Sequence, residues 1–224
     1  MIISHERRFI FLKTRKTAGS SIESLLRDHL GPDDTICSLQ GYRNDTGRWN
    51  PLPEIRRAPS GPELRLTLNQ WRKGKRYYPH MPAWRVRERA GRDVWDSYFT
   101  FCFERDPWDK LVSFYWWRTH HLDDPPDFDT FVRTTPGLSA WDQYTIDGQI
   151  AVDFVGRYEH LEEDLALVLD RVGIDAPVQL ERLKAGVRRE EPHFSPALDA
   201  YVADLFRHEI EQFGYRNRAL PAGA

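Results

Sequence analysis

The stretch FIFLKTRKTAGSSIESLL, from Phe9 to Leu26, contains the pattern that decides the fold. Its apolar start predicts a β-strand, and the polar residues from Lys13 to Ala18 predict a tight loop. Apolar residues at helical spacing after Gly19 predict a helix. A strand, a loop and a helix in this order present backbone N–H groups and the positive end of a helix dipole to an anion. The stretch therefore indicates a phosphate-binding loop.

The side chains of this loop fit the same function. Lys16 adds a positive charge, Gly19 permits close approach of the backbone, and Ser20 and Ser21 offer hydroxyl groups. The loop is not a Walker A loop, because that motif reads G-x-x-x-x-G-K-[ST] and here the lysine precedes the glycine. A surface turn with an ordinary serine cap remains an alternative explanation of these residues.

Composition limits the class of protein. The chain has 224 residues, 40% of them hydrophobic, which is enough for one α/β domain. The formal net charge of −2 argues against a nucleic-acid-binding protein that works by bulk electrostatics. Cys37 and Cys102 are too few for a disulfide framework and favour a reducing compartment. We find no signal peptide and no stretch long enough to span a membrane, so the expected location is the cytoplasm.

Two further strand–helix units follow the first one. The apolar run from Tyr98 to Phe103 predicts a buried strand, and Pro107 to Arg118 predicts the helix after it. A third strand begins at Val152 to Val155 and is followed by a helix from Leu161 to Val172. Strands that alternate with helices predict an α/β fold with a mostly parallel central sheet flanked by helices.

The remaining chain completes the predicted domain organisation. We expect a single domain over residues 1–218, with a tail over residues 219–224. Residues 40–76 lose periodicity, and we interpret them as a long irregular excursion with some order near Leu64 to Trp71. Residues 196–213 are predicted to form one final amphipathic helix.

Ligands of parallel sheets bind at the carboxyl ends of the strands. Lys16 and Arg105 follow predicted strands directly, and His80 precedes a helix predicted from Pro82 to Ala90. We expect these three side chains to converge on one crevice, although position alone would make His80 a surface or capping histidine. His120 and His121 do not have the spacing of metal ligands, and no metal site is predicted.

Four motifs, in order along the chain, resemble those of sulfotransferases. KTAGSSI (16–22) resembles the loop that binds the 5′-phosphosulfate, and ERDPWDKLVSFY (104–115) resembles the motif that binds the 3′-phosphate. VDFVGRYEHLEEDLALVLDRVGI (152–174) and HEIEQFGY (208–215) are similar to the two closing segments of the family. The resemblance is to membrane-type carbohydrate sulfotransferases, such as heparan 2-O-sulfotransferase, and their soluble bacterial relatives.

The resemblance implies a P-loop-like α/β fold that uses 3′-phosphoadenosine 5′-phosphosulfate (PAPS) as donor and releases 3′,5′-phosphoadenosine (PAP). The acceptor would be a hydroxyl group, expected on a carbohydrate or glycoconjugate, and no metal would be required. His80 lies where relatives often carry a histidine general base, and Lys16 matches their catalytic lysine. The residues that would bind the nucleotide are Lys16, Thr17, Ala18, Gly19, Ser20, Ser21, Arg105, Ser113 and Arg188, the last in a basic loop with Lys184 and Arg189.

Three residues depart from the family pattern. Arg15 replaces the usual proline, Ser20 replaces a threonine, and Glu104 stands where a small or apolar residue is usual. Glu104 could pair with Arg105 or repel the nucleotide. Two other functions remain open from the sequence: a P-loop kinase-like phosphotransferase that depends on ATP, and a non-catalytic module that binds a nucleotide or a glycan.

Overall fold

The computed structural model describes residues 1–38, 41–58, 60–180 and 191–216. In this part of the chain, six strands form one central sheet in the order β4-β3-β1-β2-β5-β8. The bounds of the strands are β1 Ile2–Ser4, β2 Phe9–Phe11, β3 Thr35–Ser38, β4 Gly41–Arg43, β5 Phe99–Glu104 and β8 Phe154–Arg157. A separate hairpin joins β6 (Thr145–Ile146) and β7 (Gln149–Ile150).

The fold is α/β, as predicted, but the sheet is mixed. β2 pairs with β5 and β5 with β8 in parallel, whereas β1, β3 and β4 extend the sheet by antiparallel pairing. The parallel part consists of the three strands that the sequence predicts. β8 approaches β5 closely because Gly156, which is opposite Phe103, has no side chain. A Cβ at Gly156 would lie 2.4 Å from the Phe103 ring.

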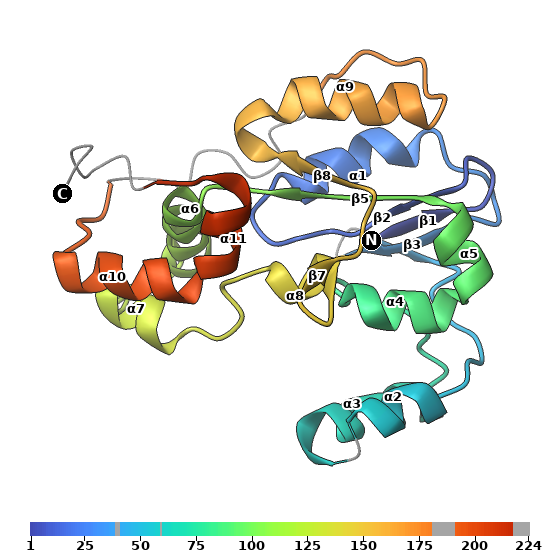
Figure 1. The fold of residues 1–224 in the computed structure, drawn as a ribbon, viewed down its shortest axis with the longest axis horizontal. Helices are drawn as coiled ribbons and strands as arrows, with labels where there is room; N and C mark the ends of the chain where they lie inside the picture. The colour runs from blue at the N-terminus through green and yellow to red at the C-terminus, as the bar shows by residue number, and fades with distance from the viewer. Residues whose placement is uncertain (39–40, 59, 181–190, 217–224) are drawn as a thin grey trace.

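Helices cover both faces of the sheet (Figure 1). α1 (Gly19–Arg27) and α9 (Leu161–Arg171) lie on one face, and α4 (Ala83–Ala90), α5 (Arg92–Ser97) and α8 (Trp141–Tyr144) lie on the other. Successive side chains of a strand point to opposite faces of the sheet, so each strand contributes residues to both faces. Phe9, Phe11, Phe101 and Phe103 pack with α1 and α9, whereas Ile10, Leu12 and Cys102 pack on the opposite side.

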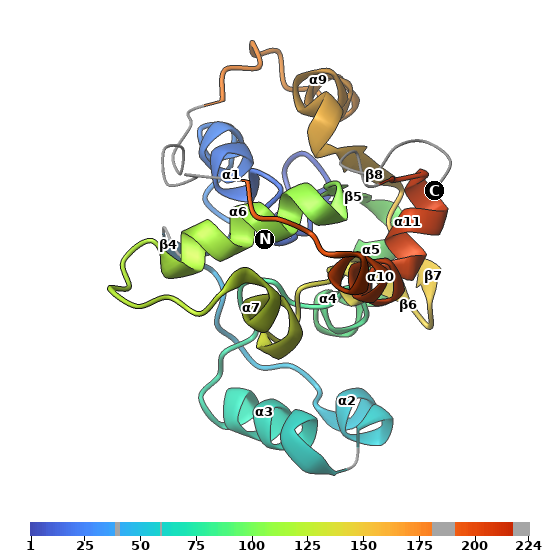
Figure 2. The same ribbon diagram turned by 90° about the vertical axis from the view of Figure 1, so that its left-hand side faces the viewer.

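A third hydrophobic cluster lies at the carboxyl ends of the parallel strands (Figures 1 and 2). It joins α6 (Pro107–Thr119), α7 (Phe128–Thr134), α10 (Pro196–Leu205) and α11 (Arg207–Phe213). The single final helix predicted from the sequence is therefore wrong, because the chain leaves helical geometry at Phe206, with φ −109° and ψ 22°. Phe206 itself is buried in this cluster.

The segment predicted to be irregular contains regular structure. Besides β4, it forms α2 (Leu52–Arg57) and α3 (Gly61–Arg72), and the second of these includes the part expected to be ordered. A proline lies in the first turn of each helix, where its missing N–H has no cost. The two helices project away from the sheet (Figure 1), which explains the weak signal in their sequence.

Candidate functional site

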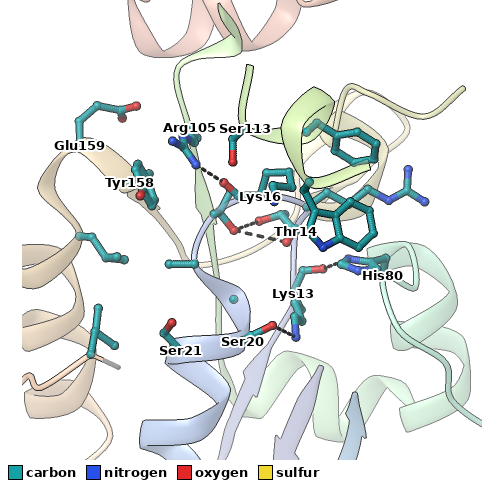
Figure 3. A pocket seen from close by; sticks show the side chains of 18 of the residues that line it. Lys13, Thr14, Lys16, Ser20, Ser21, His80, Arg105, Ser113, Tyr158 and Glu159 are labelled. Atoms are coloured by element: carbon teal, nitrogen blue, oxygen red, sulfur yellow. Dashed lines mark hydrogen bonds between the residues drawn. The ribbon is translucent and has the colours of Figure 1, made fainter. Parts of the chain in front are cut away.

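A cavity of about 960 Å³ opens at the carboxyl ends of β2 and β5. It brings together all of the described residues that the sequence nominates, from four separate segments (Figure 3). These residues are Lys16, Thr17, Ala18, Gly19, Ser20, Ser21, His80, Arg105 and Ser113. Arg188 and its neighbours Lys184 and Arg189 lie outside the described residues.

The loop between β2 and α1 has the geometry of an anion cradle. Lys16 and Ala18 have φ values of 62° and 58°, in the left-handed region that non-glycine residues adopt at a cost of about 1–3 kcal/mol each. The N–H groups of Ser21 and Ile22 donate to the carbonyl of Ala18. Gly19 and Ser20, which precede them, form the first turn of α1 at the wall of the cavity, where the helix dipole favours an anion.

Backbone strain is concentrated at this cavity. Among the described residues, six non-glycine residues have a positive φ, and three of them line the cavity: Lys16, Ala18 and His80. Strained residues persist where the surrounding structure holds them, and they cluster at ligand-binding sites.

Lys13 is a cavity residue that the sequence analysis did not nominate. Its ammonium group is buried and donates to Glu23 at 2.5 Å and to Ser20 Oγ at 3.1 Å. Because Ser20 Oγ accepts this bond, its O–H is directed elsewhere. The side chain of Lys13 passes over Gly19, where an added Cβ would lie 2.7 Å from Lys13 Cγ. The sequence signal for Lys13 as a cavity residue was its position directly after the predicted strand.

Arg105 is held by three contacts at the end of β5. Its guanidinium lies 3.8 Å from the ring centre of Tyr158, Nε donates to Asp109 at 2.6 Å, and Nη1 donates to the carbonyl of Lys16 at 2.9 Å. The residue therefore connects the phosphate-binding loop to α6 and to the end of β8. Tyr158 belongs to the segment 152–174, which resembles a sulfotransferase motif, so that motif was the sequence signal for this residue.

Glu104 does not face the cavity. Its carboxylate is buried, pairs with the ammonium of Lys110 and accepts a hydrogen bond from the backbone N–H of Arg105 at 2.8 Å. Neither expectation for this residue is met, because its charge is balanced by Lys110 rather than by the Arg105 side chain or a ligand.

His80 is fixed in one tautomer. Its Nδ1 lies 2.9 Å from the carbonyl oxygen of Lys13, so Nδ1 carries the proton and donates it, which leaves the lone pair on Nε2. Burial lowers the pKa of His80 to about 4, and the positive charges of Arg15 and Lys13 act in the same direction. The imidazole is therefore neutral at neutral pH and can accept a proton at Nε2.

The wall near His80 is aromatic and cationic. Trp117 of α6 lines the cavity with its ring centre 5.2 Å from the ammonium of Lys16. Arg15 donates from Nη1 to the carbonyl of Gly137 and so ties the loop to the turn that follows α7. Gly137 has a φ of 67°, and a Cβ there would collide with the Arg15 guanidinium. Arg15 thus makes a specific contact where the family has proline.

The described residues contain neither a cluster of metal ligands nor a membrane-spanning helix. No group of three or more His, Cys, Asp or Glu side chains there could hold a metal ion. None of the helices described is long and apolar enough to cross a membrane.

Comparison with known proteins agrees with the geometry. The model of the sulfotransferase family matches residues 1–216. An uncharacterised protein of Archaeoglobus fulgidus is 40% identical over 100 residues, which cover 42% of this chain and 83% of that protein. No solved structure matches the chain significantly.

Proposed function

Because the chain belongs to the sulfotransferase family, whose members transfer a sulfuryl group, we propose that it transfers this group from PAPS to a hydroxyl of a carbohydrate or glycoconjugate. The observation that carries the proposal is the position of His80. A neutral histidine with its tautomer fixed lies in the same cavity as a strained, lysine-bearing loop at a helix N-terminus. This arrangement supplies a proton acceptor and an anion site together.

The loop binds the 5′-phosphosulfate. Lys16 and the first backbone N–H groups of α1 stabilise the negative charge that grows on the leaving phosphate oxygen. Such groups give most of their benefit in the transition state, because the charge on that oxygen is greatest there. Lysine and amide dipoles can provide this stabilisation without a metal ion.

Arg105 and Ser113 bind the 3′-phosphate. Arg105 is oriented by Tyr158 and Asp109, so it loses little side-chain freedom when a ligand binds. Ser113 lies on α6 and lines the cavity with Arg105. Hydrogen bonds to charged groups contribute about 1.5–3 kcal/mol each.

His80 acts as the general base. The acceptor oxygen bonds to sulfur while the bond between sulfur and the bridging phosphate oxygen breaks, and the hydroxyl proton moves to His80 Nε2. PAP then leaves. A positioned general base contributes about 10²–10⁴ in rate. The aromatic wall formed by Phe114 and Trp117 offers an apolar surface for the face of a sugar ring.

The test is transfer of label from [³⁵S]PAPS to a panel of glycans, glycolipids and phenols in the presence of EDTA. Transfer to a glycan hydroxyl without metal supports the proposal. Phosphoryl transfer from ATP that EDTA abolishes would show a kinase instead. Binding of PAP without transfer to any acceptor in the panel, by a sample that is fully folded, would indicate a binding module.

A further inference from the structure

A pair of helices projects from the body of the protein, away from the central sheet (Figures 1 and 2). This helical arm consists of α2 (Leu52–Arg57) and α3 (Gly61–Arg72), with Lys73 as the C-cap residue of α3. It is joined to the body mainly through α4 and follows β4 in the sequence.

A buried network of polar groups holds the arm in place. Both carboxylate oxygens of Glu54 accept from Arg89, at 2.6 and 2.9 Å, and Thr67 donates to the same carboxylate at 2.9 Å. Arg89 also donates to Gln70 at 2.8 Å. Glu54, Thr67 and Arg89 are each 1% exposed, so these contacts are shielded from solvent. These buried contacts therefore fix the arm to α4.

The polarity of α3 is inverted relative to an ordinary surface helix. It buries the polar residues Thr67 and Gln70 against this network and exposes apolar ones. The exposed fractions are 36% for Leu66, 43% for Leu68 and 46% for Trp71. Leu52 of α2 is 53% exposed. Leu68 and Trp71 are three residues apart and share one face of the helix, whereas Leu66 lies on a different face. Apolar side chains that share an exposed face mark an interaction site.

Three apolar residues of α3 form a stripe along one face of the helix. Leu64, Leu68 and Trp71 have the i, i+4, i+7 spacing of one helix face. Arg65 and Arg72 each follow a member of this stripe by one residue, so they border it along one side, and both are exposed. Long cationic side chains beside a Leu and Trp stripe are typical of helices that lie in a membrane interface.

The charge of the arm favours one kind of partner. Arg56, Arg65, Arg72 and Lys73 are exposed. The acidic groups of the arm already face arginines of α4, because Glu54 contacts Arg89 and Glu63 pairs with Arg85. The outer surface is thus cationic although the whole chain has a formal net charge of −2. A second copy docked on the same surface would oppose like charges, which is unfavourable.

We propose that the helical arm docks on an anionic lipid surface, with Leu64, Leu68 and Trp71 in the interface and the bordering arginines on lipid phosphates. The arm binds peripherally and does not span the bilayer. Tryptophan and leucine partition into the boundary between headgroups and acyl chains, and each arginine near an anionic surface adds electrostatic attraction.

The test is flotation of the full chain with vesicles of phosphatidylcholine and with vesicles of equal parts phosphatidylcholine and phosphatidylglycerol. We expect binding to the anionic vesicles that weakens with added salt, and little binding to the neutral ones. The variant Leu68→Ser with Trp71→Ser is expected to lose at least about tenfold in affinity. Arg65→Gln with Arg72→Gln is expected to lose about 25-fold.

The matched control is Leu167→Ser, which removes a leucine that is 62% exposed on α9, outside the arm. It is expected to leave vesicle binding unchanged. All three variants change exposed side chains, and unchanged affinity for PAP would verify that their fold is intact. Equal binding to both kinds of vesicle, or full binding by both arm variants, would overturn the proposal. So would self-association without lipid that Leu68→Ser with Trp71→Ser abolishes, because a second copy would then cover the stripe.

Discussion

Replacement of His80 by asparagine separates its proton-accepting role from its structural role. Asparagine tolerates the left-handed φ of 58° at this position, and its side-chain amide can still donate to the carbonyl of Lys13. His80→Asn therefore keeps the geometry of the segment while it removes the base. We expect turnover to fall by about 10²–10⁴ and the affinity for PAP to remain close to that of the wild type.

The same variant has a predictable effect on stability. The pKa of His80 is about 4 in the folded protein against 6.5 in the unfolded chain. Between these values the unfolded chain binds more protons, so the free energy of unfolding falls as the pH decreases from 6.5 toward 4. Linkage gives a loss of about 2 kcal/mol for the wild type between about pH 7.5 and about pH 5 from this group alone. Asparagine does not titrate, so the variant lacks this loss.

Urea denaturation of both proteins at the two pH values measures the difference. Other titrating groups are common to both proteins and cancel. An equal loss of stability in the two proteins would refute the reasoning, because it would mean that His80 titrates normally in the folded state. The imidazole resonance that is missing from the NMR spectrum of the variant identifies His80 in the wild type. A titration midpoint of that resonance near 6.5 would contradict the burial argument directly.

Three further changes test separate parts of the account. Ser113→Ala should lower the affinity for PAP about tenfold and leave the affinity for 5′-AMP unchanged in calorimetric titrations. Equal losses of affinity for the two nucleotides would remove Ser113 from the 3′-phosphate site. Gly156→Ala should lower the free energy of unfolding by about 1–3 kcal/mol in urea, because its Cβ meets the Phe103 ring at 2.4 Å, and a neutral result would show that β8 can shift. Arg15→Met should raise the pKa of His80 in NMR titrations, because a positive charge is lost, and an unchanged pKa would mean that Arg15 does not contribute to the shift.

The parallel half of the fold could be predicted from the sequence because its signals are local. β2 with α1, β5 with α6, and β8 with α9 each consist of an apolar run, a short polar turn and a helical pattern that lie next to one another in the chain. The antiparallel half could not be predicted. Ile2 pairs with Ile36 as well as with Phe11, and neither pairing carries the strand–turn–helix pattern that identifies the parallel strands.

Only part of the helical arm, the order near Leu64 to Trp71, was predicted, and the rest was missed for a related reason. Thr67 and Gln70 face inward because Glu54 and Arg89 are buried beside them, and the resulting pattern on α3 does not look amphipathic in the usual sense. Tertiary contacts, not helix periodicity, decide which side of this helix is covered.

The sequence predicts which residues form the candidate site better than it predicts the contacts that they make. Lys16 and Arg105 meet at one cavity because the carboxyl ends of β2 and β5 are adjacent in the sheet. His80 joins them through its hydrogen bond to the carbonyl of Lys13. Arg105 lies at the cavity and is also paired with Asp109, a contact that its position after the strand does not reveal. The direction of Trp117 depends on how α6 is rotated against its neighbours, which the sequence does not specify.

Calorimetric titration of the unmodified protein with PAP and with 5′-AMP tests the central claim most directly, because it needs no knowledge of the acceptor. The two ligands differ by the 3′-phosphate, which in our account contacts Arg105 and Ser113. At about 1.5–3 kcal/mol for a charge-assisted hydrogen bond, one such contact predicts that PAP binds at least about tenfold more tightly, with EDTA present. Equal affinities for the two nucleotides, or tighter binding of ATP that requires Mg²⁺, would contradict the assignment of this cavity to PAPS.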